Sequence, residues 1–334
     1  MAECVTPGLI DLQVNGYAGV DFNDAGLTAD ALDHALAAMR EAGVGLCLPT
    51  LITATDDELG SRFAALDRAV AHSRLGPAMV PGFHLEGPFL NPSPGSAGCH
   101  PPAAMGPARP ELLAWLQAGL QRPILLITLA PEVAGAVDFI RAARAQGKLV
   151  ALGHTLASAA DISAAVAAGA GLSTHLGNAI SAPVHKFANP LMAQLAEDGL
   201  TASFIADGTH IPRAALRVFL RAKTLSRSIL VTDATAAAAA PVGIHDFAGM
   251  RIERTADGSV RVPGEPTLAG SALCLDQAVR NLVAWGLAEP RAAIALAADQ
   301  PAKLLAPALA AHGIDADAGY LDWDATLHPC WVGL

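Results

Sequence analysis

The chain has 334 residues, of which 52% are hydrophobic and 16% are charged. This length allows a large buried core, and it exceeds what one ordinary two-layer domain uses unless that domain is an α/β barrel. The formal net charge of −10 argues against a general nucleic-acid or anionic-membrane binder, although one local pocket can still accept a small anion.

The five cysteines are scattered and include no C-x-x-C pair, so neither a disulfide framework nor a thiolate zinc site is indicated. A reducing cytoplasm is the expected compartment. The first residues carry no basic segment and Asp11 interrupts the first apolar run, which argues against a signal peptide. The alanine run 236–240 stops at Pro241 and is too short to span a membrane.

Short apolar runs bounded by turn residues alternate with segments of helical period. Strands are expected at 9–14, 46–52, 78–86, 124–129, 149–152, 172–175, 202–205 and 228–232. Helices are expected at 28–41, from 56 onward, and at 134–146, 158–168, 190–198, 212–223, 271–285 and 290–305. Eight β/α units in sequence predict an α/β fold, a (β/α)8 or TIM barrel.

Two further segments interrupt or follow this pattern. An insertion at about 245–266 is expected to be a β-hairpin that turns at Asp257-Gly258. The tail carries short strand-like runs at 320–323 and 330–332, which with the hairpin suggest a small β appendage beside the barrel. The Gly/Pro-rich loop 91–110 is long enough that a functional role or disorder is expected.

Four of the expected strands end in chemically useful side chains: Glu86, His154, His175 and Asp233. Each one alone would more often be structural, but in a barrel all four lie on the rim formed by the C-terminal ends of the strands. One carboxylate and two imidazoles can hold a single catalytic divalent metal with an open position for water, and Asp233 is then free to act as the base. Zinc, iron, cobalt and manganese all accept such ligands.

The other strand ends argue for one metal rather than two. Gln13 and Asn15 stand where two-metal barrel hydrolases carry a His-x-His pair, and strand four offers no bridging lysine. Glu132 is the second choice as a carboxylate ligand, but Pro131 before it suggests a structural turn. His100 either reaches the rim from the long loop or lies in solvent.

Distinctive motifs occur at 7–16, 84–89, 153–155, 174–179, 206–210, 232–235 and 268–271. In their sequences and their order, these motifs resemble those of the N-acetylglucosamine-6-phosphate deacetylases of the amidohydrolase superfamily. The resemblance implies that Glu86, His154 and His175 bind the metal, that Asp233 is the acid and base, and that His210 contacts the substrate and polarises its amide carbonyl.

The resemblance also implies substrate contacts from Cys99, His100, Asn178, Ala179, Leu268, Ala269 and Gly270. It implies a barrel over about 7–305, a homodimer with the active site near the interface, and a β-sandwich. Half of that sandwich is supplied in the family by residues before the barrel, so 306–334 is expected to form the short strands of a reduced sandwich.

Where the family commonly has His-Arg-Glu, this chain has His185-Lys186-Phe187. The family's arginine binds the 6-phosphate, and Lys186 keeps the charge but lacks the planar, two-pronged donor. Phosphate recognition by Lys186 is therefore expected to be weaker or absent.

The expected activity is metal-dependent hydrolysis of N-acetylglucosamine 6-phosphate to glucosamine 6-phosphate and acetate. Three alternatives remain: a deacylase of another, unphosphorylated N-acyl amine, a cyclic-amide hydrolase with two metals, and a non-catalytic sugar-binding relative. No nucleic-acid or membrane partner is expected.

Overall fold

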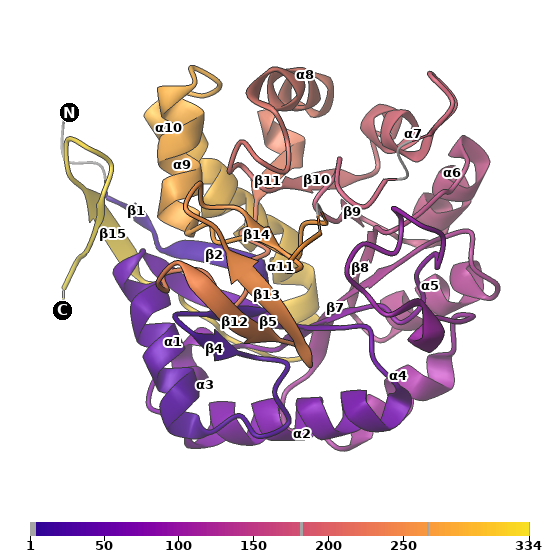
Figure 1. Ribbon diagram of the computed structural model, residues 1–334, viewed down its shortest axis with the longest axis horizontal. Coiled ribbons are helices and arrows are strands. Elements are labelled where there is room, and N and C mark those ends of the chain that lie inside the picture. Colours follow the sequence, from indigo (N-terminus) through magenta and orange to yellow (C-terminus); the bar gives the residue numbers. More distant parts are fainter. Residues whose placement is uncertain (1–4, 181–182, 266, 334) are drawn as a thin grey trace.

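The computed structural model describes residues 5–180, 183–265 and 267–333. Eight parallel strands lie side by side in chain order, with helices outside them (Figure 1). The strands are β2 (Leu9–Val14), β5 (Val44–Ile52), β6 (Phe83–Glu86), β7 (Ile124–Leu129), β8 (Leu149–Leu152), β9 (Leu172–Ser173), β10 (Thr201–Phe204) and β11 (Ser228–Leu230). The predicted (β/α)8 architecture is confirmed.

The first and last strands of this sheet meet through a short seam at the C-terminal rim. Val14 and Ala234 form an isolated parallel bridge, and the backbone N–H of Asp233 donates to the carbonyl of Gln13 at 2.9 Å. Beneath them, the carboxylate of Asp11 accepts hydrogen bonds from the backbone N–H and the hydroxyl of Thr232. The seam thus closes at the end of the barrel where the predicted site lies.

Some of the helices begin at residues whose side chains accept hydrogen bonds from the free N–H groups of the first turn. Thr28 caps the first helix, and reciprocal capping boxes join Thr55 with Glu58 and Ser158 with Asp161. The helices are α1 (Ala29–Glu41), α2 (Asp56–His72), α4 (Pro110–Ala118), α5 (Ala136–Ala145), α6 (Ala159–Ala168), α7 (Pro190–Ala196), α8 (Arg213–Lys223), α9 (Leu275–Ala284), α10 (Pro290–Ala297) and α11 (Asp299–Ala311). Shorter turns are α3 (Gly76–Met79), η1 (Pro102–Ala104) and η2 (Leu225–Arg227).

Several expected boundaries are wrong. The apolar run 78–82 is not strand: Pro77 lies in the first turn of the short helix α3, and β6 begins only at Phe83. The expected helix 290–305 is two helices, α10 and α11, because Pro301 has no N–H to donate to the carbonyl of Ala297. Helix α4 was not predicted within or after the long loop.

The helix expected from Ser271 also begins later, at Leu275. Ser271 is instead part of the barrel rim, where its backbone N–H donates to the carbonyl of Asp233 and its hydroxyl donates to the carbonyl of Thr232.

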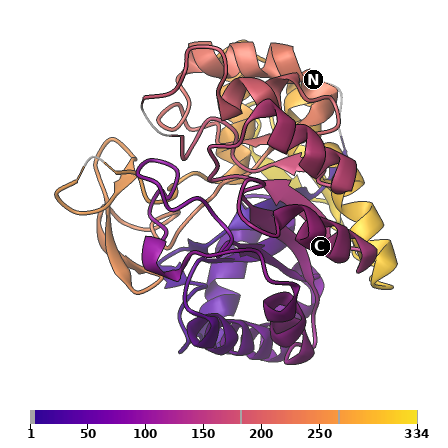
Figure 2. The ribbon, with the colours of Figure 1, turned by 90° about the vertical axis from the view of Figure 1, so that its right-hand side faces the viewer.

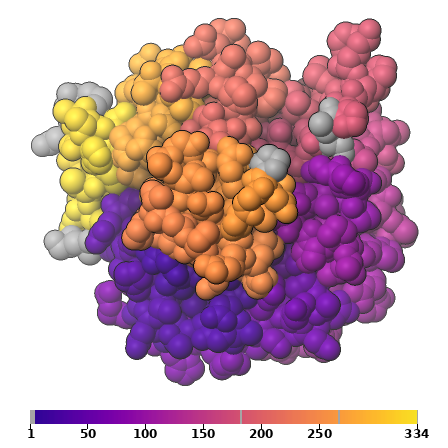
Figure 3. All heavy atoms as spheres, viewed as in Figure 1, coloured from indigo at the N-terminus to yellow at the C-terminus, as the bar shows by residue number. Residues whose placement is uncertain are grey.

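The expected hairpin has a third strand. β12 (Gly243–Phe247), β13 (Met250–Arg254) and β14 (Val260–Arg261) form an antiparallel sheet, and Asp257-Gly258 lies in the turn between β13 and β14. Figure 2 shows this sheet, in orange, standing out from the barrel beside the long loop, in purple. In the space-filling view it covers the centre of the face seen in Figure 3.

The tail strands belong to a different sheet. β15 (Tyr320–Trp323) pairs with both β1 (Thr6–Pro7) and β16 (Pro329–Trp331), and a further small hairpin joins β3 (Gly16–Tyr17) to β4 (Val20–Asp21). Trp331 fastens the tail sheet to α1 by donating from Nε1 to the carbonyl of Arg40 at 2.7 Å. The suggested single appendage is therefore two separate sheets, while the domain boundaries stay a prediction.

No helix of the described ranges is long and apolar enough to cross a membrane.

Candidate metal centre and active site

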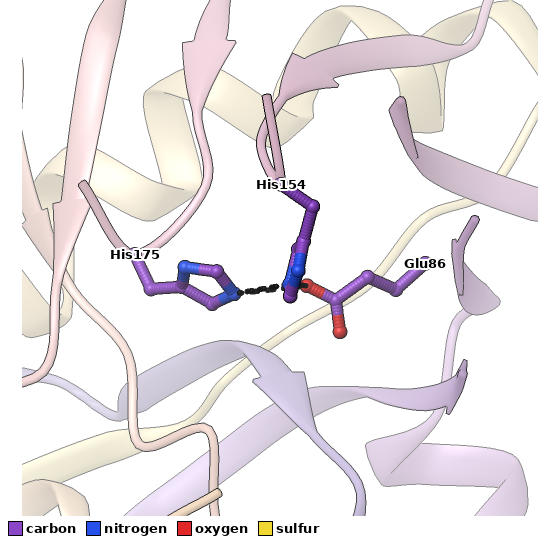
Figure 4. A group of neighbouring side chains, drawn as sticks. All are labelled: Glu86, His154 and His175. Atoms are coloured by element: carbon purple, nitrogen blue, oxygen red, sulfur yellow. Dashed lines mark hydrogen bonds and ion pairs between the residues drawn. The ribbon is translucent and has the colours of Figure 1, made fainter. Parts of the chain in front are cut away.

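Three buried side chains converge at the mouth of the barrel. Glu86 ends β6, while His154 and His175 follow β8 and β9 (Figure 4). Glu86 Oε1 lies 3.0 Å from His175 Nε2 and 3.4 Å from His154 Nε2. The two Nε2 atoms are 3.2 Å apart.

These separations suit a shared cation. Ligands at roughly 2.0–2.2 Å from a tetrahedral zinc ion lie about 3.3–3.6 Å from one another. His154 Nδ1 is 2.8 Å from the carbonyl oxygen of Ser96, which can only accept, so Nδ1 carries a proton and Nε2 presents its lone pair to the cluster. The donor set and its orientation therefore fit a divalent metal, and among the described residues this is the one cluster of such groups.

The backbone at these positions is unusual. His154, His175 and Asp233 adopt left-handed conformations with φ of 51°, 28° and 49°, and so does Ala179 at 50°. Residues with a Cβ rarely adopt this region, and such strain clusters at functional sites. At the ends of β8 and β9 it turns the chain sharply, and the two imidazoles then point at Glu86.

Two side-chain amides from β2 and the residue after it tie the cluster to Asp233. Gln13 Nε2 donates to Glu86 Oε1 at 2.9 Å and to Asp233 Oδ1 at 3.2 Å. Asn15 Nδ2 donates to the same oxygen of Asp233 at 2.8 Å. In the sequence, Gln13 and Asn15 were notable only because they replace a His-x-His pair. In the structure, both donate hydrogen bonds to carboxylates of the site.

Burial acts to raise the pKa of both carboxylates, but with their neighbours included the two pKa values shift in different directions. Burial alone would raise the pKa of Glu86, but its contacts with the imidazoles of His154 and His175 hold that pKa well below its usual range. Burial raises the pKa of Asp233, and the neighbouring charge of Glu86 raises it further, while His175 and His210 oppose the shift. Asp233 is thus the carboxylate better suited to take up a proton.

A cavity of about 230 Å³ opens above these groups. Its lining includes all three cluster residues, Asp233 and most of the predicted substrate contacts, namely Cys99, His100, Asn178, Ala179, His210, Leu268 and Gly270. The long loop, the β12–β14 sheet and the ends of most of the barrel strands thus build one shared cavity.

Two predicted substrate contacts are not brought to this cavity. Ala269 is fully buried in a small apolar cluster with Ile52 and Phe247. Lys186 is exposed in the segment before α7, with its Nζ 5.6 Å from the ring centroid of Phe187. Among the described residues, no lysine or arginine lines the cavity.

The remaining candidates have clear positions. His100 is buried, with Nδ1 bonded to the hydroxyl of Thr53 and Nε2 3.6 Å from Glu86 Oε2, and burial lowers its pKa to about 3. Burial also raises the pKa of the Cys99 thiol to about 12. Glu132 accepts bonds from Asn91 and Thr155 and so joins two loops, as the structural interpretation predicts.

Sequence reasoning missed several residues. Ile52, Ile180, Phe247 and Thr267 also line the cavity. Phe247 carried no signal, because an aromatic residue in a hairpin is most simply a packing residue. In the sequence Asp207 is only one member of the 206–210 motif, yet its Oδ2 lies 2.6 Å from His210 Nδ1. The signal that could have identified it is an acidic residue three positions before a candidate histidine.

A barrel rim that brings a carboxylate and two imidazoles close to a further aspartate is typical of metal-dependent hydrolases. The chain belongs to the amidohydrolase family, whose model matches residues 4–306. It is therefore a carbon–nitrogen hydrolase, and the family is metal-dependent.

Similar proteins of known name within this family are deacetylases of amino-sugar phosphates. An N-acetylgalactosamine-6-phosphate deacetylase from Escherichia coli O157:H7 is 35% identical over 306 residues, covering 91% of this chain and 78% of the relative. An N-acetylglucosamine-6-phosphate deacetylase from Homo sapiens is 35% identical over 340 residues, covering 97% of this chain and 80% of the relative. The expected family resemblance is confirmed.

Solved structures with a similar fold also include N-acetylglucosamine-6-phosphate deacetylases. A mutant N-acetyl-D-glucosamine-6-phosphate deacetylase from Mycobacterium smegmatis, in complex with N-acetyl-D-glucosamine-6-phosphate, matches with a TM-score of 0.87 and 29% identity, over 98% of this chain and 84% of that one. The Pasteurella multocida N-acetylglucosamine-6-phosphate deacetylase matches with a TM-score of 0.84 and 27% identity, over 98% and 84% of the two chains.

Proposed function

We propose that this enzyme hydrolyses the N-acetyl amide of a hexosamine 6-phosphate, releasing acetate and the free amino sugar. The observation that carries the proposal is the convergence of Glu86, His154 and His175 with Asp233 in one cavity. The names of the relatives support the substrate class. Because those names include both glucosamine and galactosamine derivatives, both C4 epimers are candidate substrates.

Glu86, His154 and His175 would hold the metal, for which zinc is the first candidate and iron, cobalt and manganese are the others. A bound divalent cation supplies Lewis acidity, which makes water a stronger acid and withdraws electrons from a carbonyl oxygen.

Asp233 would perform both proton transfers. It accepts a proton as the oxygen of water bonds to the acyl carbon, and it returns that proton to nitrogen as the carbon–nitrogen bond breaks. Gln13 and Asn15 restrain its Oδ1. His210, which lines the same cavity, would donate to the acyl oxygen as negative charge develops there.

The test is acetate release, followed with purified protein of known metal content. We expect release from N-acetylglucosamine 6-phosphate or its C4 epimer, together with about one equivalent of metal per chain. Release from neither substrate by metal-loaded protein would refute the proposal.

A second candidate is a deacylase of unphosphorylated N-acetyl amino sugars. It is favoured by the exposed position of Lys186 and by the lack of lysine or arginine in the described lining of the cavity. Comparing kcat/KM with and without the 6-phosphate, in the native enzyme and in Lys186→Ala, separates the two. If Lys186 binds the phosphate, the substitution lowers the preference for the phosphorylated sugar about tenfold and leaves the unphosphorylated sugar unaffected.

The homodimer and the cytoplasmic location stay predictions. Size-exclusion chromatography with light scattering tests the first. The second is supported by the thiols of Cys47, Cys99, Cys274 and Cys330, all of which are free.

A further inference from the structure

We infer that Asp207 is a positioning residue that holds His210 as an imidazolium, so that His210 Nε2 donates a hydrogen bond to the acyl oxygen during amide hydrolysis. This inference rests on the proposed function and deepens it. It assigns a role to a carboxylate that follows β10 and that the metal site does not use.

The geometry around Asp207 allows one arrangement of its carboxylate. Oδ1 accepts the backbone N–H groups of Thr209 and His210, both at 2.8 Å. Oδ2 lies 2.6 Å from His210 Nδ1. The side chain of His210 is only 6% exposed, so the ring is held by its surroundings as well as by this bond.

The position of the protons follows from these contacts. A carboxylate accepts, so Nδ1 of His210 must carry a proton. In a neutral ring Nε2 would then be an acceptor, and it could not bond to a carbonyl oxygen, which is also an acceptor. A ring that bridges Asp207 and the acyl oxygen must therefore be doubly protonated.

The charge of Asp207 stabilises that form. Burial alone would raise the pKa of Asp207, but the hydrogen bond and charge of His210 lower it below its usual value. A charged donor placed where negative charge develops stabilises the transition state more than the ground state.

A purely structural role is the rival explanation, because Oδ1 forms a turn with two backbone N–H groups. Asp207→Asn separates the two roles. Asparagine keeps a carbonyl oxygen for the turn, but it loses the negative charge and can turn an N–H toward His210 Nδ1. His210→Gln removes the ring itself.

The experiment is a double-mutant cycle on acetate release from the better hexosamine 6-phosphate, using Asp207→Asn, His210→Gln and the double variant. We expect Asp207→Asn to lower kcat about 10- to 100-fold with little change in KM. The double variant should be no slower than His210→Gln, because Asp207 acts through His210. Asp138→Asn, an exposed carboxylate paired with Arg141, makes the same charge change and should keep full activity.

A second substrate tests where His210 acts. An N-trifluoroacetyl group has a more electrophilic carbonyl and needs less polarisation. Asp207→Asn should therefore lower kcat by a smaller factor with this substrate than with the N-acetyl substrate. Equal losses on both substrates, additive effects in the cycle, or a kcat within about threefold of the native value would overturn the inference.

Proton NMR keeps the inference separate from the proposed function. The short Asp207–His210 contact predicts a strongly deshielded Nδ1 proton resonance in the native enzyme that disappears in both Asp207→Asn and His210→Gln. Its absence from the native enzyme refutes the imidazolium pair. If native enzyme deacetylates neither hexosamine, the proposed function and the carbonyl role fail together, whatever the resonance shows about the pair.

Discussion

Gln13 Nε2 lies 3.2 Å from Asp233 Oδ1, across the seam where the first and last strands of the barrel meet. The same nitrogen donates to Glu86 Oε1 at 2.9 Å. One amide group thus joins the proposed base to a proposed metal ligand. This contact connects the closure of the fold to the chemistry of its site.

Gln13→Glu would place a third carboxylate between Glu86 and Asp233. We expect the free energy of unfolding of the metal-free protein to fall by about 2–4 kcal/mol, because an uncompensated charge is then buried. Added zinc should raise Tm by more than it does in the native protein, since the cation offsets the extra charge. Differential scanning calorimetry with and without zinc measures both effects. Gln277→Glu, exposed on α9, is the control, and an equal response from it would contradict the explanation.

Asp233→Asn should separate catalysis from metal binding. The substitution removes the proton acceptor but leaves Glu86, His154 and His175 in place. We expect kcat to fall about 10²- to 10⁴-fold while the metal content stays at that of the native enzyme. Elemental analysis and acetate assays on one preparation test this. Asp246→Asn, an exposed carboxylate on β12, should retain activity; nearly full activity in Asp233→Asn would remove Asp233 from its role.

The burial of Lys148 predicts that the free energy of unfolding rises with pH in the alkaline range. It is 1% exposed, with Nζ bonded to Gln117 Oε1 and the carbonyl of Ile124, and burial lowers its pKa to about 8. Between that value and the ordinary lysine value near 10.4, the unfolded chain binds more protons than the folded one, so the free energy of unfolding rises with pH.

The slope from Lys148 is at most about 1.4 kcal/mol per pH unit, and Lys223, whose pKa burial also lowers to about 8, adds to it. Urea denaturation at pH 7.5 and pH 9.5 should show a smaller gain in Lys148→Met than in the native protein. Lys303→Met, exposed on α11, should keep the native gain. An identical gain in all three proteins would rule out the buried ammonium as the source.

Thr232→Val tests the barrel seam. The hydroxyl of Thr232 donates to Asp11 Oδ2 at 2.6 Å, and it accepts from the backbone N–H of Ala234 at 3.1 Å. Removing it leaves buried polar groups unpaired, which costs about 1–3 kcal/mol of unfolding free energy. Because Asp233 lies between these residues, kcat should also fall while metal content is unchanged. Thr201→Val, partly exposed on β10, should alter neither stability nor kcat.

Much of the fold was accessible from the sequence because the signals are local. Apolar runs bounded by Gly, Pro and Asn predict strands, and the capping residues Thr28, Thr55 and Ser158 lie where helices begin. The errors arose where tertiary contacts outweigh local pattern. Ser271, for example, looked like a helix start, but it bonds to the backbone of the barrel rim.

Glu86, His154 and His175 were predicted as metal ligands from their residue types and their positions at strand ends, and in the structure they lie together. Lys186 was chosen by its place in a motif, and the structure leaves it exposed and outside the cavity lining. A sequence motif gives the order of residues along the chain, but it does not show whether the loop that carries Lys186 extends to the cavity.

By itself, the sequence determined that eight β/α units carry Glu86, His154, His175 and Asp233 at the ends of strands, because strand ends are set by residues close by in the chain. Only the tertiary structure decided which groups meet. Gln13 bonds to residues 73 and 220 positions away, and those contacts exist only once the sheet closes. Barrel closure also buries the cluster, and that burial sets the direction in which the pKa of Asp233 moves.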